Sequence, residues 1–145
     1  MVRSTWGAEL CQLSDGCDFL LVLAACFAEL QHGRQSPQAL RDLTAGTGEL
    51  RSPLQLHACV DAQSVFSGIT AEEVRVPAER HALYHAQWVR ELLDKKLLEA
   101  LWWIDTRDCC PDGLTKGSVA RDAIIAVMHG EWRLDHAPKR WPARR

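Results

Sequence analysis

Hydrophobic residues recur at spacings of three and four through the first thirty positions. This periodicity predicts a helix from about Thr5 to Gln31, and Gly33 lies where a C-terminal cap is expected. The uncharged run at residues 19–28 is apolar nearly all round, so we expect this half of the helix to be buried on more than one side. The run is shorter than the roughly 20 residues of a membrane helix, which favours a core helix. The apolar positions are Trp6, Leu10, Leu13, Cys17, Leu20, Leu21, Ala24 and Phe27.

Two later segments have the pattern of strands. In residues 54–60, Leu56, Ala58 and Val60 alternate with His57 and Cys59, so the two sets face opposite sides. Residues 98–104 predict a second strand. The remaining predictions are a surface connection at 33–53 with a helical turn at 37–43, helices at 62–68 and 78–96, and a last helix at 119–129 capped by Ser118 and ended by Gly130.

This order predicts an α/β fold. Two strands joined by a helical crossover are expected to be parallel, with a right-handed connection. Two strands make a marginal sheet, because sheets usually have about four to six. The pattern therefore indicates either a truncated domain or one that borrows strands from a partner.

Composition restricts the class of protein further. The chain has 145 residues, 47% of them hydrophobic and 25% charged, which is typical of about one globular domain. A net charge of −2 excludes a strongly basic nucleic-acid-binding sleeve. No basic segment precedes the apolar run, so neither a signal peptide nor a membrane segment is expected. The six cysteines form no C-x-x-C pair, which favours free thiols and an intracellular location, cytoplasmic or nuclear.

Three carboxylates stand at positions suited to chemistry. Glu9 borders the apolar stripe of the first helix, Asp61 ends the first strand, and Asp112 lies in a Pro-Asp-Gly turn. Carboxylates gathered at strand ends favour Mg²⁺ or Mn²⁺, and two such ions about 4 Å apart serve phosphodiester hydrolysis. Each residue also has a structural interpretation. Glu9 complements the helix dipole, Asp61 is the N-cap of the next helix, and Asp112 is a turn residue.

Residues 103–117 carry the most specific motif, Trp-Ile-Asp-Thr-Arg-Asp-Cys-Cys-Pro-Asp-Gly-Leu-Thr-Lys-Gly. The segment resembles the RNase H domain at the end of copia-type retrotransposon polyproteins, where a strand precedes Thr-x-x-x-x-Ala-Asp-x-x-Thr-Lys. Three weaker similarities lie upstream and occur in the same order as in the family. They are a Ser-Thr-x-Ala-Glu segment, an Asp-x-x-Ser segment and a His-x-x-x-His-x-x-x-x-Arg-Glu segment. The matching residues are Ser4, Thr5, Glu9, Asp61, Ser64, His81, His85, Arg90, Glu91, Thr106, Asp112, Thr115 and Lys116.

The resemblance implies a partial RNase H-like fold at residues 4–130: two parallel strands with flanking helices, followed by a basic tail at 131–145. It also implies a metal site of four carboxylates in the order Asp, Glu, Asp, Asp. Glu9, Asp61 and Asp112 match the last three. The strand with the first Asp and its two hairpin neighbours are missing from this chain, and Pro111 replaces the family's Ala.

The function implied is that of a fragment of a reverse transcriptase/RNase H polyprotein. Its ancestral activity is Mg²⁺- or Mn²⁺-dependent hydrolysis of RNA in RNA–DNA hybrids, and the missing ligand predicts an incomplete catalyst. Arg90 and Lys116 are candidate contacts to nucleic acid. The alternative is a non-catalytic α/β module that binds protein or nucleic acid. Its open strand edge would also permit self-association.

Overall fold

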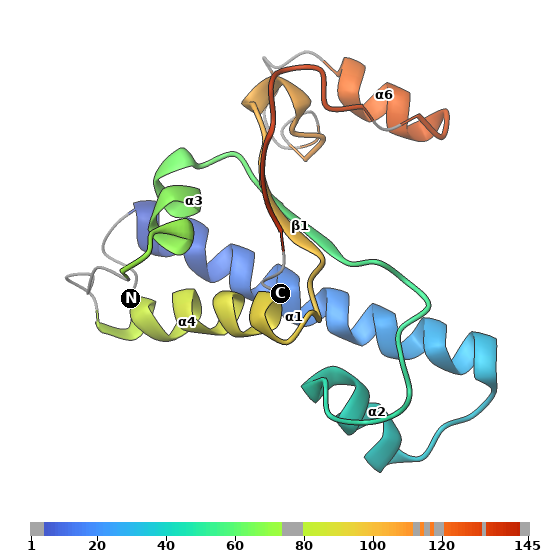
Figure 1. The fold of residues 1–145 in the computed structure, drawn as a ribbon. Coiled ribbons are helices and arrows are strands. Elements are labelled where there is room, and N and C mark those ends of the chain that lie inside the picture. Colours follow the sequence, from blue (N-terminus) through green and yellow to red (C-terminus); the bar gives the residue numbers. More distant parts are fainter. Residues whose placement is uncertain are drawn as a thin grey trace.

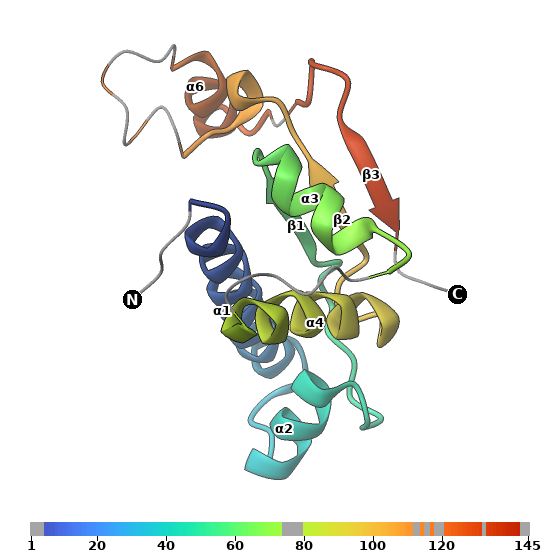
Figure 2. The same cartoon turned by 90° about the vertical axis from the view of Figure 1, so that its left-hand side faces the viewer.

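Helices and a small sheet form two packed layers in the computed structural model, which describes residues 5–73, 80–111, 114, 117, 121–131 and 133–142. Helices α1, α3 and α4 pack together beside the sheet, while α2 and α6 lie at opposite ends (Figures 1 and 2). This arrangement confirms the predicted α/β class. The elements of the two layers are α1 (Thr5–His32), α3 (Gln63–Thr70), α4 (Arg80–Asp94), β1 (His57–Val60), β2 (Ala100–Trp103) and β3 (Lys139–Pro142).

The sheet has the order β1-β2-β3. Strands β1 and β2 are parallel, as predicted, with His57 opposite Ala100 and Val60 opposite Trp103. Strand β3 runs antiparallel to β2 and pairs Trp141 with Leu101. The expectation of only two strands is therefore wrong, because residues 139–142 of the predicted basic tail join the sheet. They satisfy backbone groups that β2 would otherwise expose.

Helix α1 has the predicted extent. Gly33 follows it with a φ of 77°, a left-handed conformation that glycine adopts without strain. Its second half, however, is buried on one side only: Phe19 is 63% exposed and Leu30 is 80% exposed. The reason is that α2, α3, α4 and β1 all pack against the side of α1 that faces the core, and nothing in the described part of the chain covers the opposite side. By length and composition alone α1 could also cross a membrane.

The shorter helices depart from prediction mainly at their ends. Helix α2 (Pro37–Ala45) extends the predicted turn; the Ser36 side chain accepts a hydrogen bond from the Ala39 amide at 3.1 Å. Helix α6 (Asp122–Met128) begins later than predicted and buries none of its residues. The predicted Ser118 cap lies outside the described residues.

Tryptophan side chains join the helices of the helical layer. The Trp6 indole of α1 donates to the Ser64 backbone oxygen of α3 at 3.2 Å, and the Trp88 indole of α4 donates to Asp18 of α1 at 2.8 Å. Each bond satisfies a polar group beside the apolar core, which sets the helices against one another. The largest fully buried side chains are Leu10, Cys17, Val65, Ile69, Val89, Leu92, Leu98 and Leu101.

Candidate functional site

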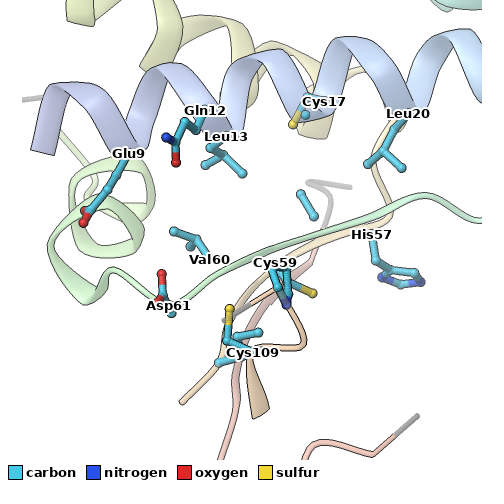
Figure 3. Close-up of a pocket in the computed structure, with 14 residues that line it drawn as sticks. Glu9, Gln12, Leu13, Cys17, Leu20, His57, Cys59, Val60, Asp61 and Cys109 are labelled. Carbon is cyan, nitrogen blue, oxygen red and sulfur yellow. The ribbon is translucent and has the colours of Figure 1, made fainter. Parts of the chain in front are cut away.

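A cavity of about 340 Å³ lies between α1 and β1 (Figure 3). Leu13 and Leu20 of α1 line one wall, and Ala58 and Val60 of β1 line the other. Its walls are mostly apolar, and the carboxylates that line it, Glu9 and Asp61, lie at the end where β1 finishes. The cavity therefore combines an apolar base with a localised pair of oxygen donors.

Glu9 and Asp61 reach this cavity from distant parts of the sequence. Glu9 projects from the second turn of α1 towards the end of β1, where the Asp61 carboxylate lies (Figure 3). No ion pair to either carboxylate is found within the described residues. A cation bound at this end of the cavity would have carboxylate oxygens from both sides within the same lining.

Hydrogen bonding from the sheet holds the end of β1 in place. The Trp103 indole of β2 donates to the Asp61 backbone oxygen at 2.9 Å, and the Ile104 amide donates to the Val60 oxygen at 3.0 Å. These two bonds fix the backbone from which the Asp61 side chain starts. The position of this carboxylate therefore depends on the parallel β1–β2 pair.

The third predicted carboxylate, Asp112, lies outside the described residues. The chain leading to it is described: Cys109 and Pro111 line the same cavity as Glu9 and Asp61. Within the described residues no three His, Cys, Asp or Glu side chains are grouped to hold a metal ion. The structure thus brings Glu9 and Asp61, two of the three candidates, to one cavity. Their carboxylate oxygens fit a hard divalent cation, whose other ligands would have to come from other groups.

Three thiols also line the cavity: Cys17, Cys59 and Cys109. Burial raises the pKa of Cys17 to about 12, with a smaller contribution from Asp18. The side chain of Cys59 is partly accessible to solvent, but the surrounding protein desolvates its thiol and raises its pKa to about 11. The nearby Cys109 and Cys110 raise the pKa further. Both thiols stay protonated at neutral pH, which makes them poor metal ligands and poor nucleophiles.

Sequence reasoning missed an ionisable pair outside this cavity, in which the carboxylate is buried and the histidine is partly exposed. Asp108, which is 5% exposed, accepts hydrogen bonds from the His136 backbone amide at 3.0 Å and pairs with the His136 ring at 2.8 Å. Burial alone would raise the pKa of Asp108, but the contacts with His136 outweigh it and lower the pKa. The partners are 28 positions apart, so no local motif could reveal them.

Of the two predicted nucleic-acid contacts, only Arg90 is described. Its guanidinium donates to the Ala71 backbone oxygen at 2.8 Å and lies 5.7 Å from the centre of the Trp141 ring. These contacts connect α4 to the end of α3 and to β3. Arg90 therefore has a structural role in addition to any contact with nucleic acid, and Lys116 lies outside the described residues.

Comparison with known proteins adds no assignment. No family model, no curated protein and no solved structure matches the chain.

Proposed function

We propose that the chain carries part of an RNase H-like nuclease site of the copia retrotransposon type. In this proposal Glu9, Asp61 and Asp112 hold Mg²⁺ or Mn²⁺, and the ancestral reaction is hydrolysis of the RNA strand in an RNA–DNA hybrid. The metal would supply an activated water and stabilise the leaving oxygen. The protein's own contribution is to hold the carboxylates at the end of a parallel strand pair.

One observation carries the proposal: Glu9 and Asp61 line the same end of one cavity. Their convergence is independent support, because the resemblance rests on short motifs and says nothing about this chain's packing. The structural interpretations of the two residues, a helix-dipole Glu and an N-cap Asp, give no reason for them to meet. Indeed Ala62, not Asp61, is the N-cap residue of α3, and it forms no side-chain cap bond.

The position of Pro111 supports the third ligand. Pro111, the residue before Asp112 in the sequence, lines the cavity. Three carboxylates would give a divalent ion enough charge to bind. The fourth carboxylate that the resemblance implies has no counterpart among these 145 residues, so we expect metal binding by this chain without efficient cleavage.

Urea unfolding followed by tryptophan fluorescence tests the site. A cation that binds only the folded chain stabilises it, by about 2.7 kcal/mol at a hundredfold excess over its dissociation constant. We expect millimolar Mn²⁺ to raise the unfolding midpoint of the native chain. The Asp61→Asn variant should lose most of this increase, because it loses the charge that the cation neutralises.

Asp15→Asn is the matched control. Asp15 is exposed on the same helix as Glu9, does not line the cavity and loses the same charge when changed to Asn. The control should keep the full response to Mn²⁺. An equal response in the Asp61→Asn and Asp15→Asn variants would place the metal elsewhere and contradict the proposed site.

A further inference from the structure

A second cavity, of about 370 Å³, lies between α1, α2 and the turn that joins α4 to β2. Its inner wall is apolar, because Leu21 of α1, Leu43 of α2 and Leu56 before β1 line it and all three are buried. It shares no lining residue with the cavity between α1 and β1. Its volume and apolar wall are typical of a site for a small molecule.

Cationic side chains line the same cavity, and two of them have no acidic partner. Lys95 pairs with Glu91 at 2.6 Å, and the carboxylate in the lining, Glu99, is paired with an arginine of β3. Arg51 donates to backbone oxygens of its own segment, which carry no net charge. Within the described residues neither Arg51 nor Lys96 pairs with a carboxylate. The lining therefore has two positive charges that no acidic side chain neutralises.

Lys96 occupies a backbone position that usually belongs to glycine. Its φ is 57°, in the left-handed region, and its amide donates to the Leu93 oxygen at 3.2 Å. The Leu97 amide donates to the Leu92 oxygen at 2.8 Å. The two bonds form the Schellman motif that ends α4, in which glycine avoids the strain of the left-handed residue. The end of α4 therefore gives no reason for lysine here, whereas a role for its charge at the cavity does.

We propose that this cavity binds an aliphatic carboxylate, with its hydrocarbon chain against the buried leucines and its carboxylate between Arg51 and Lys96. The chain would remove water from the apolar wall, and the carboxylate would neutralise the two cations. The Arg51 guanidinium has parallel N–H donors that match the two oxygens of a carboxylate. An uncharged hydrocarbon would leave the cations uncompensated, and a small inorganic anion would leave the apolar wall in contact with water.

Titration calorimetry with octanoate tests the proposal. We expect saturable binding at one site per chain, and weaker binding of 1-octanol, which has a hydrocarbon chain of the same length without the charge. Lys96→Gly removes the ammonium group and suits the left-handed backbone, so the urea midpoint of the free chain should stay the same or rise. The octanoate dissociation constant should nevertheless rise about fivefold, and Arg51→Gln should have a similar effect.

Arg41→Gln is the matched control, because Arg41 is exposed on α2 and does not line the cavity. It should leave the affinity for octanoate unchanged. Lys96→Gly should also leave the response to Mn²⁺ unchanged, so this test is independent of the proposed nuclease site. Absence of saturable octanoate binding to the native chain would overturn the proposal. So would equal affinities for octanoate and 1-octanol, or an affinity for octanoate that neither Lys96→Gly nor Arg51→Gln lowers.

Discussion

The two edges of the sheet are protected in different ways. Strand β3 carries Lys139, Arg140 and Pro142, all of them exposed, and β1 carries no charged residue between His57 and Val60. Charges and proline on an edge strand discourage pairing with another chain, because they add repulsion and remove a hydrogen-bond donor. The comparison indicates that β3 closes the sheet and β1 leaves it open to a further strand.

The edges also differ in what holds them. Val60 and Ala58 of β1 are buried in the core beneath α1 and α3, whereas β3, beyond its backbone pairing with β2, depends on contacts made by individual side chains. Lys139 lies 5.1 Å from the centre of the Trp103 ring, and Arg140 lies 5.6 Å from that of Trp102. The Asp108–His136 pair secures the chain shortly before β3 begins. We therefore expect β3 to detach under milder conditions than β1.

The largest effect should come from Leu101→Ala, which weakens both edges together. Leu101 is fully buried on β2 and lies opposite Ala58 on one side and Trp141 on the other. The cavity left by the lost side chain should lower the free energy of unfolding by about 2–5 kcal/mol in urea denaturation. Leu114→Ala, at a position 78% exposed, should change it by less than about 0.5 kcal/mol.

Trp141→Ala should destabilise the β3 edge of the sheet and leave the β1 edge unaffected. Trp141 is half-buried and packs from β3 against the core, where its ring faces Arg90. We expect a loss of about 2 kcal/mol, below the range for a fully buried tryptophan. Hydrogen exchange should show lost protection in β3 and retained protection in β1. Equal loss in both strands would contradict the difference between the edges, and Trp141→Phe should restore most of the protection.

Asp108→Asn should weaken the attachment of the segment that leads into β3, with an effect of about the same size. The variant removes the charge that pairs with the His136 ring, at a cost of about 1–3 kcal/mol at pH 7. Because the pKa of Asp108 is lower in the folded chain, its stabilisation is complete above the unfolded pKa of about 3.9. It is lost as the pH falls through the folded pKa.

The pH dependence gives a direct check on that pair. The difference in unfolding free energy between the native chain and Asp108→Asn should be present at pH 5 and above and shrink below about pH 4. Asp15→Asn, at an exposed position, is the control and should show no such change. A difference that does not shrink below about pH 4 would mean that Asp108 does not stabilise the fold as a carboxylate.

The smallest effect should come from Arg140→Ala. Arg140 is exposed and lies 3.5 Å from the Glu99 carboxylate, a separation at which a surface ion pair contributes little. We expect a loss below about 1 kcal/mol, of which part comes from the contact with the Trp102 ring. Raising the salt concentration should narrow the difference from the native chain. A loss as large as that of Trp141→Ala would mean that charge, and not packing, holds β3.

Local periodicity accounts for the features that could be predicted from sequence. The apolar spacing of α1, the glycine that ends it and the alternation through Ala58 and Val60 each depend on neighbours within a few residues. The parallel pairing of β1 and β2 follows from the helical crossover between them. The helix α1 therefore appears with its expected bounds, and β1 ends where predicted but begins at His57, three residues later than expected.

The tertiary structure alone decided which distant residues meet. Residues 139–142 have neither alternation nor strand composition, and they form β3 because β2 offers an unpaired edge and a place for Trp141. The pairing of Asp108 with His136 depends on the same docking. The meeting of Glu9 and Asp61 at one cavity required α1 to pack over β1, a contact set by the shape of the whole core. Periodicity encodes which face of an element is apolar, but not which other element covers it.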